Sequence, residues 1–406
     1  MSISATRASH RRPKNGEVAG QLVDAYLEQM AVTGVVGATV RVVAARAGAS
    51  ASAVSYHFDT IERLYVTAQA EAVARAGRWL DRTLDDVAPS APLPASAFPV
   101  FAAQVIARWV DQPTLAQAEA CAMQEASWGG AEAGPWIDLW NGFWRRTATV
   151  FSIEPEASLI IAAVLQSERI GHLAKWRALH DRAALYEVCE RLIARLIGDA
   201  TLLARPDVWR DKAEELSCRA VTFPELNAGA GRIAAAVVGA VDAGGEAALT
   251  HRAAAARAGV SLGAVTHHFP TRTTLAEAGY AWLYGTIVAL AGNSVPRKAT
   301  HADMGLHIRS FLDVGLAAPG VRALEVFFLS ATRDPSLADF AARVRYSRGL
   351  STWEYLREAA PHLTRLDGVL MSHLVTGLGR MISVSPEQAE EILDRSAPLA
   401  ERMFRA

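Results

Sequence analysis

The feature that most constrains the fold of this chain is an internal repeat. Residues 34–64 align without a gap on residues 245–275, at a constant offset of 259 − 48 = 211 between Gly48 and Gly259. Fifteen of the 31 aligned pairs are identical, and they include Thr, Arg, Gly, Ser, His, Phe and Leu positions as well as alanines. A compositional bias toward alanine would not align so many residue types in one register. The chain therefore carries one structural unit twice.

Composition excludes several classes of protein. The 406 residues are 51% hydrophobic, which is enough for two or three domains with real cores. The formal net charge is −1, so nucleic-acid binding would depend on local basic clusters. Cys121, Cys189 and Cys218 show neither zinc-ligand nor disulfide spacing, and no cofactor or metal is expected. Because no signal peptide and no apolar run of about 18 residues are found, we expect a cytoplasmic protein without membrane spans.

Each copy of the repeat predicts a helix-turn-helix. In the first copy, Thr39 is a good N-cap for a short helix over residues 40–47. Residues 48–50 then form a tight turn, and a third helix directs Val54 and Phe58 inward. The second copy shows the same pattern 211 residues later. Such a motif places its last helix in the major groove of DNA.

The remainder of the chain is also predicted to be helical, which makes the fold all-α. Alternating β patterns are sparse, and prolines punctuate long helical runs. We divide the chain into a basic N-terminal arm (1–15), helix-turn-helix unit 1 (16–64), a helical regulatory domain (65–198), a linker (199–226), helix-turn-helix unit 2 (227–275) and a second helical regulatory domain (276–406). A short helix is expected inside the linker, at residues 211–219.

At Ser55-Tyr56-His57-Phe58 and Thr266-His267-His268-Phe269 the two units resemble the TetR family of transcriptional repressors. The resemblance covers residues 16–75 and 227–285, and elsewhere extends only to all-helical architecture. Family members are homodimers joined through their last two helices. The resemblance therefore implies two subunits in tandem, with residues 157–197 and 366–405 packed together as a monomeric, intramolecular pseudo-dimer. Tethering raises the effective concentration of each half for the other to roughly millimolar.

The resemblance and the helix geometry together indicate which residues face DNA. Short side chains on the outer face of the third helix would meet base edges, and cap residues and the Tyr/His-His pair would meet phosphates. The candidates are Thr39, Arg41, Ser50, Ala51, Ser52, Ser55, Tyr56 and His57 in unit 1, and Thr250, Arg252, Ser261, Leu262, Gly263, Thr266, His267, His268 and Arg272 in unit 2. His57 and His268 could instead be packing residues, and Thr39 and Thr250 are expected to cap helices in either case.

Neither recognition helix contains Arg, Asn or Gln, the usual bidentate base readers. Readout would then depend on hydroxyls, thymine methyl groups and DNA shape. The N-terminal arm, which holds four cations, is either a disordered tail or a segment that adds contacts to unit 1. Because the two recognition helices differ, we expect an asymmetric operator with half-sites about 34–36 Å apart.

A tryptophan stripe marks the first regulatory domain. Trp136, Trp140 and Trp144 recur every four residues and would share one helix face. The stripe is either a core seam or the wall of a pocket for a small apolar effector. In the second case the pocket residues would be Glu119, Gln124, Glu125, Trp128, Trp136, Trp140 and Trp144. An effector that fits one conformation would change the spacing of the units and release DNA.

These patterns predict a DNA-binding regulator, most simply a repressor whose partners are a double-stranded DNA operator and a small apolar effector. Two other classes are weighed against it. An all-α enzyme is disfavoured, because the chain contains no HExxH, GxSxG, P-loop or DDxxD motif. A protein-interaction module that has lost DNA binding in one or both units is favoured by the near-neutral charge. Steep dependence of DNA binding on salt would discriminate against that module.

Overall fold

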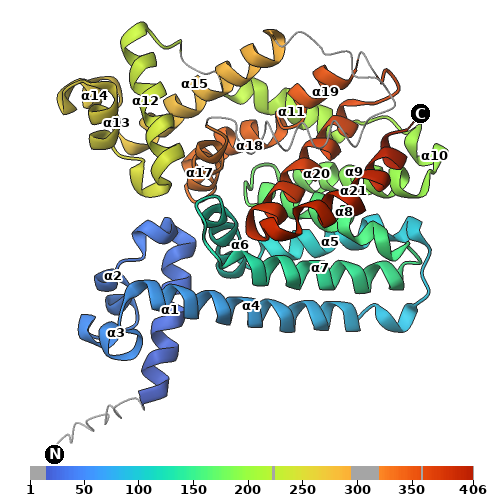
Figure 1. The fold of residues 1–406 in the computed structure, drawn as a ribbon, viewed down its shortest axis with the longest axis horizontal. Helices are drawn as coiled ribbons and strands as arrows, with labels where there is room; N and C mark the ends of the chain where they lie inside the picture. The colour runs from blue at the N-terminus through green and yellow to red at the C-terminus, as the bar shows by residue number, and fades with distance from the viewer. Residues whose placement is uncertain (1–14, 222–224, 294–319, 358–359, 406) are drawn as a thin grey trace, which may run out of the picture.

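The computed structural model describes residues 15–221, 225–293, 320–357 and 360–405. Within these ranges all regular secondary structure is helical, so the all-α prediction is confirmed. The basic arm lies outside the described residues, apart from Asn15. Figure 1 shows a large helical body, from which the two repeat copies project at one side.

Unit 1 has the predicted order of helices. Its long first helix breaks at Gly34, where φ is 71°, and its short second helix is followed by Gly48 with φ 63°. Glycine suits both places because positive φ is strained for residues with a Cβ atom. Val54 is buried, as expected, whereas Phe58 is only half-buried against the core. The helices of this part are α1 (Asn15–Gly37), α2 (Val40–Arg46), α3 (Ala51–Phe58) and α4 (Ile61–Asp85).

Unit 2 repeats this backbone. Gly245 and Gly259, which align with Gly34 and Gly48, have φ values of 64° and 65°. Val265 and Phe269 are buried, as predicted for the inward face of the third helix. The helices here are α12 (Ala228–Gly244), α13 (His251–Ala258), α14 (Leu262–His268) and α15 (Arg272–Asn293). The sequence repeat is thus a repeat of conformation, down to the same two left-handed glycines.

The body of the molecule is built from the helices that follow each unit. Those of the first half are α5 (Phe98–Val110), α6 (Pro113–Ala126), α7 (Ala133–Val150), α8 (Ser158–Gly171) and α9 (Ala178–Ile197). Those of the second half are α17 (Val321–Thr332), α18 (Ala338–Tyr346), α19 (Leu350–Leu356), α20 (Arg365–Val384) and α21 (Ala389–Phe404). Their buried side chains form one continuous hydrophobic core with both units, so the halves are not independent globules.

The last two helices of each half pack together, which matches the predicted pairing of residues 157–197 and 366–405. α20 runs along α8 and also contacts α9, while α21 contacts both (Figure 1). The backbones approach most closely at Gly377, where an added Cβ atom would lie 2.1 Å from the carbonyl oxygen of Ala163. Only glycine allows the two helices to come so near to each other.

Charged groups are buried in this contact between the halves. The Arg195 guanidinium donates from Nε and Nη2 to the two carboxylate oxygens of Asp367, over 2.9 and 2.7 Å. Glu168 lies between His172 and His373, with nitrogen–oxygen distances of 3.1 and 2.9 Å. Burial, partly offset by Glu168, lowers the pKa of both imidazoles to about 4. Buried pairs of this kind fix the geometry of a contact more than they stabilise it.

The predicted linker is more ordered than a simple connection. It contains α10 (Ala200–Leu203) and α11 (Trp209–Ala220), and α11 packs against both α9 and α18. The Arg210 side chain is buried and donates from Nη2 to the backbone carbonyl of Arg345 over 3.0 Å. The expected helix at 211–219 is therefore present, but it belongs to the body rather than to a free tether.

No helix in the described ranges is long and apolar enough to cross a membrane.

Candidate nucleic-acid interface

The recognition helix of unit 1 exposes the residues predicted to face DNA. Ala51, Ser52, Ser55 and Tyr56 are all exposed, and the Tyr56 ring is the most prominent of them at 72% exposure. Val54, on the opposite face of α3, is held in the core, which fixes the outward direction of the others. The face that unit 1 presents is therefore small, polar and edged by one aromatic ring.

Unit 2 presents a different face from the same backbone. Leu262, Gly263, Thr266 and His267 are exposed on α14, and Leu262 is 48% exposed. The Thr266 hydroxyl donates to the carbonyl oxygens of Leu262 and Gly263 within its own helix. Unit 2 therefore offers a more apolar surface, with its one hydroxyl on this helix partly engaged.

The helix caps distinguish the two units further. Thr250 and Ser261 accept hydrogen bonds from the backbone N–H groups of Ala253 and Ala264, over 3.1 and 3.2 Å. Thr39 and Ser50 occupy the same N-cap positions in unit 1, yet neither hydroxyl makes a capping hydrogen bond. Thr39 and Thr250 are therefore both N-cap residues, as expected, but only Thr250 caps its helix with a side-chain hydrogen bond.

This difference has a chemical consequence. The first N–H groups of a helix have no partner within the helix, and they attract anions. In unit 1 the starts of α2 and α3 lack side-chain acceptors, and the Ser50 hydroxyl lies only 2.8 Å from that of Ser52. Those N–H groups are free to donate to a phosphate oxygen. In unit 2 the Thr250 and Ser261 hydroxyls already accept from one N–H group at each helix start.

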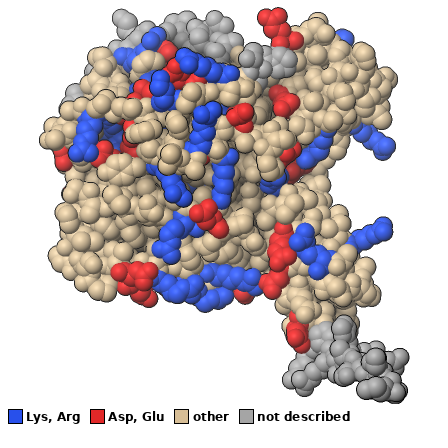
Figure 2. All heavy atoms as spheres, turned by 180° about the vertical axis from the view of Figure 1, so that it is seen from behind, with Lys and Arg blue, Asp and Glu red and all other residues tan. Residues whose placement is uncertain are grey.

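The arginines predicted to contact DNA differ in whether they already have partners in the protein. Arg41 and Arg252 are exposed at equivalent positions and make no ion pair within the described part of the chain. Arg272 donates instead to the Leu249 carbonyl and to the carboxylate of Glu246, so it is not a free cation. Figure 2 shows basic side chains projecting from both lobes that stand out at the right of that view.

Sequence reasoning missed Arg63 as a cation beside the recognition helix. It follows α3 at the start of α4 and is 72% exposed, with its Nη1 atom 2.6 Å from the Asp59 carboxylate. A surface pair of this kind contributes little, so the guanidinium can exchange Asp59 for a phosphate. Arg63 is visible in the sequence five positions after Phe58, beside the third helix that the repeat predicts.

The two histidine pairs are divided between surface and packing. His267 is exposed, whereas His57 and His268 are half-buried. The His57 and Tyr56 rings meet edge to face, with centroids 5.0 Å apart. The His268 ring lies against the start of α12, 3.5 Å from the place of a Cβ atom at Gly229. The packing interpretation therefore fits His268 better than His57.

The tryptophan stripe lies in the core of the first half. Trp136, Trp140 and Trp144 are all at most 2% exposed, and the Trp136 indole donates to Gln69 over 3.0 Å. This burial favours the core interpretation over that of an effector pocket. The carboxylate of Glu119 already has a cation, since it accepts from Arg169 Nη2 over 2.5 Å.

The other residues predicted to line the effector pocket also make contacts within the protein. Gln124 is buried, and burial together with the nearby Glu246 carboxylate raises the pKa of Glu125. The Trp128 indole donates to the Asp242 carbonyl of α12 over 3.2 Å, and so supports unit 2.

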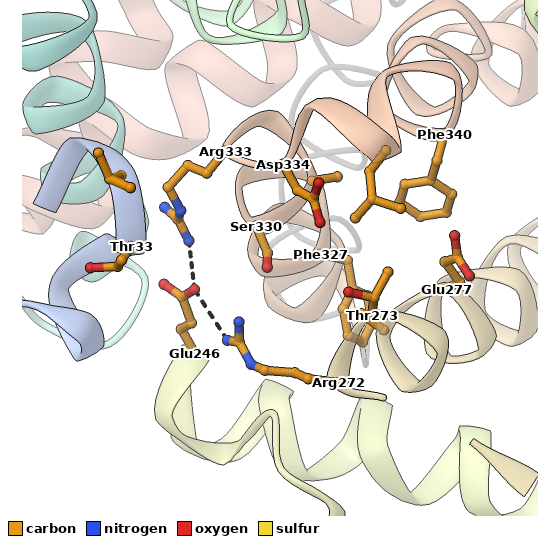
Figure 3. Close-up of a pocket in the computed structure, with 14 residues that line it drawn as sticks. Thr33, Glu246, Arg272, Thr273, Glu277, Phe327, Ser330, Arg333, Asp334 and Phe340 are labelled. Atoms are coloured by element: carbon orange, nitrogen blue, oxygen red, sulfur yellow. Dashed lines mark hydrogen bonds and ion pairs between the residues drawn. The ribbon is translucent and has the colours of Figure 1, made fainter. Parts of the chain in front are cut away.

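A pocket of about 250 Å³ does lie elsewhere, where the two units meet. Its walls come from the end of α1, from the turn between α12 and α13, and from α15, α17 and α18 (Figure 3). Phe327 and Phe340 give it an apolar side, and Glu246 and Arg272 lie at one end. None of the seven residues predicted to line an effector pocket lines this one.

Comparison with known proteins adds no assignment: no protein-family model matches the chain, and no curated protein matches it either.

Proposed function

We propose that the chain is a DNA-binding transcriptional regulator that acts as a single-chain pseudo-dimer. The observation that carries the proposal is the duplicated helix-turn-helix. Two copies share N-cap positions, left-handed glycines and an outward recognition face, and they project from one side of one body. A paired arrangement of this kind suits a DNA duplex, whose successive major grooves face the same side once per helical turn. The TetR-like interpretation of the repeat supports the same proposal.

The proposal assigns most of the affinity to unit 1. Uncapped helix starts at Thr39 and Ser50, the exposed Tyr56 ring and the Arg63 guanidinium all surround α3. The equivalent caps in unit 2 are already satisfied, and its recognition helix begins with the exposed Leu262. The operator is accordingly asymmetric, with a strong half-site and a weak one. A ligand-responsive repressor is the simplest role for such a protein.

A second candidate is a regulator in which unit 2 no longer touches DNA. The specific observation in its favour is the exposed Leu262 on α14, where an apolar side chain suits a protein partner better than a charged phosphate. In this case unit 2 would serve assembly or recruitment, and unit 1 alone would bind DNA.

The test is a binding and footprinting experiment on the DNA that flanks the chain's own gene. Tyr56→Ala and His267→Ala are compared with Leu179→Ala, which removes a 79% exposed side chain from α9, outside both units. We expect at least a tenfold loss of affinity for Tyr56→Ala, a smaller loss for His267→Ala and none for Leu179→Ala. Affinity should also fall steeply with salt, because phosphate contacts release counterions.

Three outcomes are decisive. Equal losses from Tyr56→Ala and His267→Ala would mean that both units bind DNA to a similar extent. Loss from Tyr56→Ala alone would select the second candidate. Absence of DNA retention even at about 50 mM salt, where phosphate contacts are strong, would reject DNA binding altogether. A footprint over a perfect palindrome would contradict the predicted asymmetry.

A further inference from the structure

The pocket between the two units is formed by neither unit alone. Val32 and Thr33 from the end of α1 close it on one side, and Glu246 from the turn of unit 2 closes it on another. Its remaining walls belong to α15, α17 and α18 of the second half. A molecule bound there contacts unit 1, unit 2 and the body at the same time.

One end of the pocket pairs a single carboxylate with two guanidiniums. Oε1 of Glu246 accepts from Nη2 of Arg333 over 2.5 Å and from Nη2 of Arg272 over 3.2 Å. The side chains of Glu246 and Arg333 are each only 5% exposed. Gly34 lies close to these charged side chains, since a Cβ atom there would be 2.6 Å from the Glu246 carboxylate. This end therefore holds two guanidiniums and one carboxylate, and Nη1 of Arg333 has no hydrogen-bond partner in the described ranges, so its net charge is positive and a ligand cation belongs at the other end.

The opposite end carries two carboxylates, and neither forms an ion pair with a residue that the structure describes. Asp334 accepts from the backbone N–H and the hydroxyl of Ser336, and within the described ranges these are its only hydrogen-bond donors. Glu277 has no hydrogen bond or ion pair with any residue in the described ranges, and Figure 3 shows its carboxylate pointing toward Phe340. Burial, and then the nearby Asp334 carboxylate, raise the pKa of Glu277. Two carboxylates that repel each other in a part-buried place favour a cation beside them.

The wall between the two ends is apolar. Phe327, Phe340 and Leu337 are all buried, and Figure 3 shows the Phe340 ring beside Glu277. Aromatic faces attract organic cations as well as apolar groups. A cavity of about 250 Å³ is near the lower limit of small-molecule sites, which restricts the ligand to a few carbon atoms or one ring.

We propose that this pocket binds a small organic cation with an apolar body, whose ammonium lies beside Glu277 and Asp334 and whose body packs on Phe327 and Phe340. Because the walls come from both units, the bound cation fixes the position of unit 1 relative to unit 2. Binding itself does not depend on the proposed function, whereas this effect on DNA recognition does.

The test uses three probes with one carbon skeleton: phenylpropylamine, phenylpropanol and phenylpropionate. Titration calorimetry on the full chain should show that the amine binds at least tenfold more tightly than the alcohol or the acid. Glu277→Gln should reduce amine affinity at least tenfold, whereas Glu156→Gln, which removes the same charge from the exposed turn before α8, should leave it unchanged. Glu277→Lys should reverse the preference, so that the acid binds better than the amine.

Equal binding of amine and alcohol would overturn the proposal, and so would the absence of binding by all three probes. The wild-type series decides this even if the variants fail to fold, which thermal melting would reveal. DNA affinity is measured separately, with and without the amine. Loss of DNA binding in every condition would reject the proposed function while leaving the cation site intact. A cation that binds without changing DNA affinity would reject only the coupling between the units.

Discussion

The contact between α8 and α20 makes a sharp prediction about Gly377. An alanine there would place its Cβ atom 2.1 Å from the carbonyl oxygen of Ala163 and 2.6 Å from the adjacent carbonyl carbon. Ordinary contact begins at 3.4 Å, so the two backbones must separate by about 3.4 − 2.1 = 1.3 Å. The clash is with backbone rather than with a flexible side chain, and no rotamer change relieves it.

The expected cost follows from the kind of clash. Forcing an extra carbon into a packed interior costs about 1–3 kcal/mol, against a gain of about 1 kcal/mol for replacing Gly by Ala within a helix. Because the shift affects a whole helix pair, we expect the cost at the upper end of that range, so that Gly377→Ala lowers the free energy of unfolding by about 3 − 1 = 2 kcal/mol. Chemical denaturation monitored by circular dichroism measures this directly.

Gly142→Ala is the matched control. Gly142 lies inside α7, and an added Cβ atom there meets nothing within 4 Å. The same chemical change should therefore stabilise the protein by up to about 1 kcal/mol. If Gly377→Ala proved as stable as Gly142→Ala, the close approach of α8 and α20 would be refuted, and with it the intramolecular pairing of the two halves.

Two further predictions concern the buried charges of the same contact. Arg195→Ala leaves the Asp367 carboxylate buried without its cation and should cost about 3–5 kcal/mol, while replacing both residues by leucine should recover much of the loss in a double-mutant cycle. The pKa of His172 and of His373 is about 4 in the folded chain, below the ordinary 6.5, so the unfolded chain binds more protons between those values. Stability should therefore be complete above about pH 6.5 and fall as the pH decreases toward 4, and His373→Asn should flatten that dependence in melting experiments. A melting temperature that stays constant from pH 7 to 4.5 would contradict this explanation.

Local features of the fold could be predicted because their causes are local. Gly34, Gly48, Gly245 and Gly259 all adopt the left-handed conformation that their places after helices suggested. The inward direction of Val54 followed from helical periodicity alone. These features depend on residues a few positions apart, which a single sequence displays directly.

Features that depend on distant residues could not be predicted in this way. Glu246 aligns with Val35 in the repeat, and its main partner, Arg333, lies 87 residues further along the chain. Nothing in the periodicity joins them, so the pocket between the units remained hidden. The tryptophan stripe was ambiguous for another reason, since a core seam and a pocket wall require the same residues at the same spacing. Only packing against Gln69 and Arg169 distinguishes the two.

The pairing of α8 with α20 also determines how long α8 remains without that partner while the protein is synthesised. The ribosome must add 365 − 171 − 1 = 193 residues after the end of α8 before α20 begins. At the usual rate of about 5–20 residues per second, this takes roughly 10–40 s. During that interval the surface of α8 that packs on α20 has no native partner, although α8 can already contact α5 and α7, and this exposes the nascent chain to aggregation and to chaperones. Slow synthesis between the two helices should therefore lower the yield of folded protein, although it alters no contact of the finished molecule.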